Sequence, residues 1–169
     1  MRRLARLEDE RGANLVEFAL VLPVLVALVF GIVEFGIAYN SNLELRSGSR
    51  EGARLAAVDN GCSVTPASCS GFDATGRRNA LVADTRARMA GLADPSEIGV
   101  DISFPDGAAQ AGDDVRVCVY HAIDSATGMF PFLNGTVLES VAVMRLEQDA
   151  TFVAGHNAPA SWTGAAHSC

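Results

Sequence analysis

The feature that most constrains this chain is an uncharged apolar run near its N-terminus. From Phe18 to Val33 the sequence FALVLPVLVALVFGIV contains no charged side chain. As a helix this run would be about 24 Å long at ~1.5 Å per residue, a little shorter than the ~30 Å hydrocarbon core of a bilayer. Glu17 and Glu34 bracket the run, and their carboxylates can lie near opposite interfaces. We therefore predict one transmembrane helix over residues 15–39.

Charge is distributed unevenly on the two sides of this helix. Residues 1–12 carry 4 Arg and 3 acidic residues, which leaves 13 − 4 = 9 Arg and 20 − 3 = 17 acidic residues, a net charge of −8, for the rest of the chain. The phosphates of a nucleic acid would repel such an acidic body. The leader arginines favour a cytoplasmic N-terminus, although Arg46, Arg50 and Arg54 follow the helix and weaken that signal.

The placement of the cysteines supports the same orientation. All four follow the apolar run, as expected for a domain in an oxidising compartment outside the cytoplasm. Of the three possible pairings we predict Cys62–Cys69, which would close a Gly/Ser/Pro-rich loop, and Cys118–Cys169, which would tether the C-terminal tail. The alternative is four buried or free thiols.

The helix is expected to continue beyond the membrane. Residues 40–58 contain no proline, and Gly48 and Gly52 lie on one stripe of small side chains that would let a neighbouring helix or the outer domain approach closely. The turn signal Asp59-Asn60-Gly61 should end the helix near Val58. The predicted organisation is a cytoplasmic leader over residues 1–12, a long helix over 13–58 and an extracytoplasmic domain over 59–169.

Hydrophobic patterning predicts an α+β fold for this domain. Residues 77–93 have a helical pattern with Leu81, Val82, Met89 and Leu92 as candidate core residues. Three segments are expected to be extended, the third of them bent or partly helical: residues 98–104, 113–122 and 136–153. The tail after Ala154 is expected to be irregular. The fold class is thus a long N-terminal transmembrane helix, a short helix and an antiparallel sheet of about three strands.

No catalytic constellation is evident in the sequence. His121, His156 and His167 are dispersed, and no glycine-rich phosphate loop follows a strand. The C-terminal His167-Ser168-Cys169 could bind a metal, but a solvated tail is the simpler interpretation. We therefore expect no enzymatic activity, no cofactor and no metal site.

The most informative segment is Arg11-Gly12-Ala13-Asn14-Leu15-Val16-Glu17-Phe18, in which a charged leader ends at a glycine and an acid follows five residues later. A plain anchor needs no acid there, because an ionisable side chain in a membrane helix is costly. Glu17 could simply extend to the interface. Alternatively, a cut after Gly12 would give Ala13 a free α-amine, and that amine could pair with Glu17 of a neighbouring chain.

This arrangement resembles the N-termini of type IV pilins, and more narrowly the TadE-like family of the Tad (Flp) pilus machinery. Two parts carry the resemblance: residues 11–23, with Arg11-Gly12 and Val16-Glu17-Phe18, and residues 50–58, with Arg50-Glu51-Gly52-Ala53-Arg54. It covers about a quarter of the chain and implies a pilin-like fold. It implies a minor pilin or pseudopilin cut by a prepilin peptidase at Gly12 and Ala13. Glu17, Phe18, Gly48 and Gly52 would serve helix packing and assembly. Its partners would be other pilins or pseudopilins, the Tad pilus platform, the prepilin peptidase and the lipid bilayer.

Two other hypotheses stay open. The chain could be a membrane-anchored extracytoplasmic binding domain whose anchor is never cut. It could also be a secreted protein, because Gly36-Ile37-Ala38 resembles a small-x-small signal peptidase site. Glu17 within the apolar segment and Glu34 just before that site weaken the secreted alternative.

Overall fold

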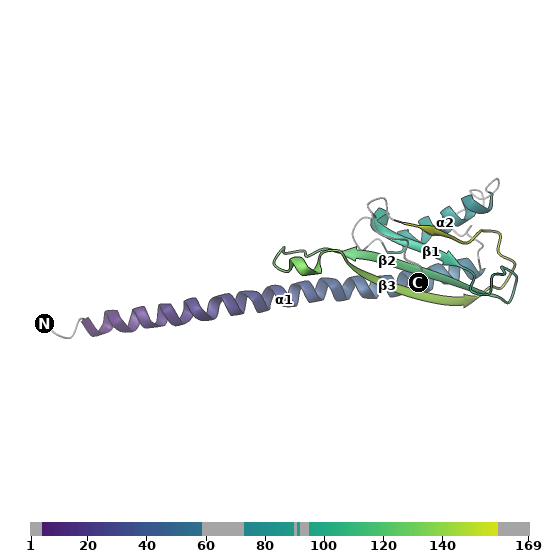
Figure 1. Cartoon of the computed structure of the whole chain (residues 1–169). Coiled ribbons are helices and arrows are strands. Elements are labelled where there is room, and N and C mark those ends of the chain that lie inside the picture. The colour runs from purple at the N-terminus through teal and green to yellow at the C-terminus, as the bar shows by residue number, and fades with distance from the viewer. Residues whose placement is uncertain (1–4, 59–72, 90, 92–94, 159–169) are drawn as a thin grey trace.

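A computed structural model describes residues 5–58, 73–89, 91 and 95–158 of the chain. Its dominant element is α1 (Ala5–Val58), whose N-terminal half projects away from the folded domain (Figure 1). The helix is continuous as far as Val58, and it includes residues 5–11 of the predicted leader. The sequence ARLEDER, which opens the helix, is rich in strong helix formers, so the charged leader continues the helix in the N-terminal direction.

Four antiparallel strands form one sheet in the order β3-β2-β1-β4. Their bounds are β1 (Ile98–Ser103), β2 (Asp114–Ile123), β3 (Thr136–Arg145) and β4 (Gly155–Asn157). The longest ladder joins β2 and β3, from Asp114 opposite Arg145 to Ile123 opposite Thr136. The predicted antiparallel α+β fold is confirmed, with a fourth strand in the tail that we expected to be irregular. That strand, Gly-His-Asn, has no apolar alternation, and it is defined by pairing with the edge of β1.

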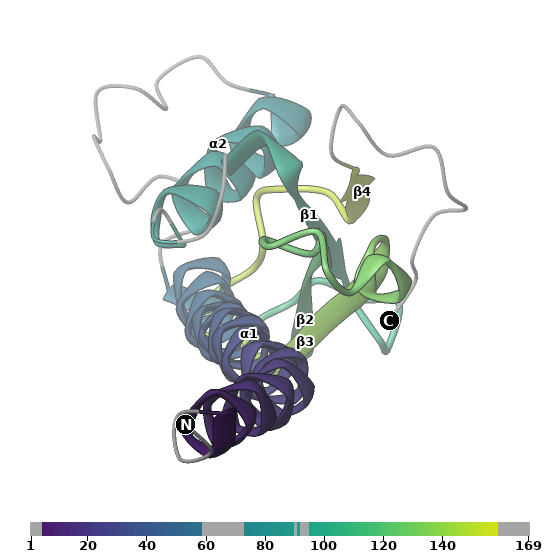
Figure 2. The ribbon, with the colours of Figure 1, turned by 90° about the vertical axis from the view of Figure 1, so that its left-hand side faces the viewer.

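Both helices lie on one face of the sheet (Figure 2). The short helix α2 (Ala74–Ala87) begins at Asp73, whose carboxylate accepts a hydrogen bond of 2.8 Å from the backbone N–H of Gly76. The C-terminal half of α1 packs across β2 and β3, and α2 packs against α1 and β1. The extended segment predicted over residues 113–122 is confirmed as β2, and its side chains Val115, Val117 and Val119 are fully buried in the core.

Candidate functional site at the helix and sheet junction

Exposure along α1 changes where the helix meets the domain. From Leu45 onward α1 contributes buried core residues, whereas the large apolar side chains from Leu15 to Phe30 are exposed, apart from the half-buried Val26. An 18-residue window of α1 has a mean hydropathy of 2.7, and none of that window is buried inside the protein. The helix is therefore long and apolar enough to cross a membrane, as the sequence predicts.

Glu34 occupies the boundary between these two halves, and its side chain is bound by the loop that joins β2 to β3. This segment, residues 124–135, is called the junction loop below. One carboxylate oxygen, Oε1, accepts hydrogen bonds from Ser125 Oγ at 2.5 Å, Thr127 Oγ1 at 2.7 Å and Thr127 N at 3.0 Å. The other, Oε2, accepts one from Ala126 N at 3.1 Å. Glu34 is only 5% exposed, so a buried acid is satisfied here by four neutral donors.

The junction loop is itself held in shape by internal bonds. Asn134 Oδ1 accepts a bond of 2.7 Å from the backbone N–H of Ser125, which closes the two ends of the loop. Gly135 has a φ of +77°, which favours glycine, and its N–H donates to the carbonyl of Ile123 at 3.0 Å. These bonds place Ser125 and Thr127 where they can donate to Glu34. Sequence reasoning missed this contact because Glu34 and Ser125 are 91 residues apart.

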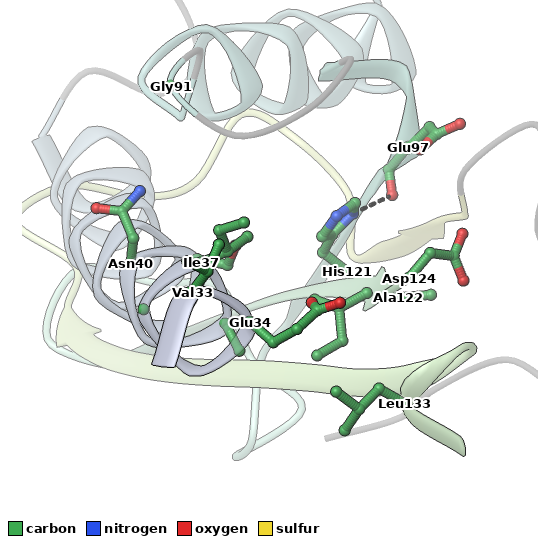
Figure 3. Close-up of a pocket in the computed structure, with 14 residues that line it drawn as sticks. Val33, Glu34, Ile37, Asn40, Gly91, Glu97, His121, Ala122, Asp124 and Leu133 are labelled. Carbon is green, nitrogen blue, oxygen red and sulfur yellow. Dashed lines mark hydrogen bonds between the residues drawn. The ribbon is translucent and has the colours of Figure 1, made fainter. Parts of the chain in front are cut away.

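A groove of about 580 Å³ lies beside Glu34, between α1 and the end of β2 (Figure 3). Val33, Ile37 and Leu133 contribute apolar walls, and Asp124 lies at its edge. His121 is 6% exposed, with Nδ1 3.3 Å from the carbonyl oxygen of Glu97. In the described part of the chain, no group of three His, Cys, Asp or Glu residues is placed to hold a metal ion.

The other described histidine, His156, fastens β4 to the sheet. Its Nε2 lies 3.1 Å from the hydroxyl of Tyr120, and the two rings stack with their centroids 5.8 Å apart. The Tyr120 ring lies directly over Gly99, where no β-carbon would fit. Burial raises the pKa values of Tyr120 and of Asp101, and an electrostatic contribution from the neighbouring His156 partly offsets the change at Asp101. The hydrogen bond and the ring stacking between His156 and Tyr120 thus help to hold β4, a strand of three residues, at the edge of the sheet.

The structure separates the predicted site residues into two groups. Gly12, Ala13, Glu17 and Phe18 lie on the exposed N-terminal part of α1, where 61% of Phe18 is accessible. Glu17 is about 25 Å along the helix from Glu34, at ~1.5 Å per residue. None of the four contributes to the buried core, so any contact they make in an assembly has to come from outside this chain's domain.

Gly48 and Gly52 instead lie inside the domain. A β-carbon on Gly48 would collide with the Met89 side chain, which follows α2 and is 1% exposed. A β-carbon on Gly52 would lie 2.8 Å from Cγ2 of Thr85, on α2, and 3.3 Å from Cγ1 of Val117, on β2. The small stripe thus lets α1 approach both α2 and the sheet within one chain.

The cysteine predictions fall largely on residues that the structure does not describe. Cys118 lies on β2, is 2% exposed and is not a free thiol. Cys62, Cys69 and Cys169 lie outside the described residues, as does Leu92. The pairings Cys62–Cys69 and Cys118–Cys169 therefore stay predictions.

The fold and this junction define a class of protein: a small α+β domain carried on a long, exposed apolar N-terminal helix. The family model described as TadE-like protein matches residues 12–54 of the chain. The match confirms the TadE-like resemblance. It includes the exposed apolar run of α1, Glu34, and the small residues Gly48 and Gly52. No curated protein and no solved structure matches the chain.

Proposed function

We propose that this protein is a non-enzymatic membrane component of a Tad (Flp) pilus assembly or secretion system, built like a minor pilin or pseudopilin. The TadE-like match supports an association with the Tad pilus system in general. The observation that carries the proposal is the division of α1: one face of its C-terminal part is buried in the domain, whereas the apolar run in its N-terminal part is exposed. An exposed apolar helix in front of a compact domain can be anchored in a bilayer and can pack against equivalent helices of partner subunits.

In this proposal a prepilin peptidase removes the leader between Gly12 and Ala13 on the cytoplasmic side. Both residues lie inside α1, so the helix must open locally for the chain to enter a protease cleft. Glycine eases such opening because it stabilises a helix by ~1 kcal/mol less than alanine. The new amine of Ala13 would be positive at neutral pH and would pair with Glu17 of a neighbouring helix.

The proposed orientation is supported by the leader arginines and by the position of all four cysteines after the apolar run. We propose that the N-terminus is cytoplasmic and that the domain, with its cysteines oxidised, lies outside the cytoplasm. A reporter enzyme fused after Val58 should be active only outside the cytoplasm. Activity of the fusion inside the cytoplasm would reverse the topology.

The contact at Glu34 argues against the secreted alternative. A cut after Ala38 would remove Glu34 from the domain and leave the donors of Ser125 and Thr127 without their acceptor. The alternative of an uncut anchored binding domain is favoured by a different observation, the 580 Å³ groove at the junction. The two remaining hypotheses differ in whether the leader is removed and in whether Glu17 is needed for assembly.

Assembly is tested with three substitutions at one position. Glu17→Ala and Glu17→Gln should still insert, because each removes a charge from an apolar segment, but both should lose co-purification with partner pilins. Glu17→Asp keeps the charge and should retain part of that association. Equal recovery of partners with Glu17→Gln and with the parent chain would overturn the proposed role of Glu17.

A further inference from the structure

We propose that the tip of the junction loop inserts into the membrane beside α1 and contacts the acyl chains of the leaflet from which the domain emerges. The tip consists of residues 129–133, Met-Phe-Pro-Phe-Leu. This inference rests on the proposed function in one respect, namely that α1 spans a membrane. It adds a second point of insertion that the anchor alone does not require.

The depth of the tip follows from its contact with α1. Glu34 binds the base of the loop, and the tip continues along α1 toward the N-terminal half of the helix (Figure 1). A β-carbon built on Gly31 would lie 3.9 Å from Cζ of Phe130. Gly31 belongs to the uncharged run and precedes Glu34 by about 4.5 Å of helix at ~1.5 Å per residue. The Phe130 ring is therefore level with residues of the predicted span.

The composition and exposure of the tip match a lipid environment. Residues 125–135 contain no charged side chain. Phe132 is 76% exposed and Met129 is 48% exposed, which is unusual for large apolar side chains on a water-facing loop. Together with Phe35 on α1, which is 72% exposed, Phe130 and Phe132 line an apolar recess of about 220 Å³. The apolar surface of the loop is thus continuous with the surface of the helix.

The backbone of the loop is the most specific observation. Lipid offers no hydrogen-bond partners, so a segment that enters it must satisfy its own N–H groups. Apart from Phe132, and from Pro131, which has no N–H, every residue from Ser125 to Gly135 donates its N–H inside the protein. The acceptors are Asn134 Oδ1, the two Glu34 oxygens, Ser125 Oγ, Thr127 Oγ1 and the carbonyls of Phe130, Pro131 and Ile123.

Glu34 has a defined role in this arrangement. Its carboxylate lies at the same depth as the base of the loop and accepts hydrogen bonds from four donors there. An acid at a membrane boundary is costly when it lacks such partners. The loop therefore shields the charge that ends the apolar run, and the charge in turn fixes the loop against α1.

Tryptophan quenching by brominated lipids tests the depth of the tip in the full-length chain. The single tryptophan, Trp162, is first replaced by Phe, and Phe132→Trp is introduced. The protein is reconstituted into phosphatidylcholine vesicles with brominated acyl chains at a high lipid-to-protein ratio. We expect strong quenching and blue-shifted emission. The control is Val143→Trp, at an exposed position on β3 that is 48% accessible and lies away from the junction, and it should not be quenched.

A third probe separates this inference from the proposed function. Leu25→Trp lies in the middle of the apolar run and reports whether α1 is in the bilayer. Quenching at Leu25→Trp but not at Phe132→Trp, with Met129→Trp also unquenched and circular dichroism like that of the parent, would overturn the loop inference and leave the anchor standing. Absence of quenching at Leu25→Trp would overturn both.

The same samples distinguish lipid from a second copy of the chain as the occupant. If the tip contacts lipid, quenching of Phe132→Trp persists as the protein is diluted with lipid. If emission is instead blue-shifted without quenching, and the shift disappears on dilution, the tip contacts another copy and the inference is wrong.

Discussion

Replacing Gly52 with alanine tests the close packing of α1, α2 and the sheet. The added methyl group would lie 2.8 Å from Cγ2 and 2.9 Å from Oγ1 of Thr85, and 3.3 Å from Cγ1 of Val117. Thr85 and Val117 are both fully buried, and Thr85 Oγ1 also donates to the carbonyl of Leu81 at 2.8 Å. Neither neighbour can therefore move aside without disturbing the core.

The expected magnitude is a difference between two effects. Overpacking a tight core costs about 1–3 kcal/mol. Alanine stabilises a helix interior relative to glycine by ~1 kcal/mol, which offsets part of that cost. Gly52→Ala should thus lower the free energy of unfolding by roughly 1 kcal/mol, up to about 2 kcal/mol. Ser47→Ala, on the exposed side of the same helix, is the matched control and should leave stability unchanged or raise it by a few tenths of a kcal/mol.

Urea unfolding of the full-length chain in detergent micelles, followed by far-ultraviolet circular dichroism, measures these differences. A second substitution, Thr85→Ala, removes both atoms closest to the new methyl group. The double variant should therefore be more stable than the sum of the single effects predicts, by about 0.5–3 kcal/mol. If Gly52→Ala is as stable as Ser47→Ala and the two changes are additive, α2 does not pack on α1 at this point and the reasoning fails.

Three further predictions concern the junction, the sheet edge and the cysteines. Glu34→Ala should accelerate hydrogen exchange at the amides of Ala126 and Thr127, which lose their acceptor, and leave β2 amides unchanged; unchanged exchange in the loop would contradict the contact. Burial raises the pKa of Asp101 above its ordinary value of 3.8, so at a pH between its unfolded-state and folded-state pKa values the folded protein keeps a proton that the unfolded protein has lost. The free energy of unfolding should therefore fall as the pH rises through this range, and Asp101→Asn should lessen the fall. Urea titrations at several pH values measure this, and an identical pH dependence of the variant and the parent would refute the account. Non-reduced peptide mapping should recover Cys62–Cys69 and Cys118–Cys169, each stabilising the domain by ~2–4 kcal/mol, whereas four alkylatable thiols would exclude both.

Local signals in the sequence predicted much of the fold. The strand pattern of residues 113–122 predicted β2, in which Val115, Val117 and Val119 share one buried face, although Cys118 and Tyr120 on the opposite face are buried as well. The absence of proline from residues 40–58 predicted that the helix continues beyond the apolar run, and α1 reaches Val58. Residues 5–11 of the predicted leader also lie in α1, because a charged segment can still be rich in helix formers.

Features that depend on distant pairing could not be predicted in this way. The strand β4 has three residues and no apolar pattern, so only its partner β1 defines it. Glu34 could be recognised as the end of the apolar run, but its binding to the junction loop requires the β2–β3 hairpin to reach α1. The family match covers residues 12–54 and thus includes Glu34 but not the loop that binds it.

The most direct test of the proposed function is the N-terminal sequence of the protein extracted from membranes that contain the matching prepilin peptidase. The account predicts a mature chain that begins Ala13-Asn14-Leu15. Gly12→Val should block the cut, whereas Gly36→Val, at another glycine of α1 with open space around it, should not. A chain that still begins at Met1 would support an uncut anchor, and one that begins at Tyr39 would support a secreted protein. Either result would contradict a processed pilus component.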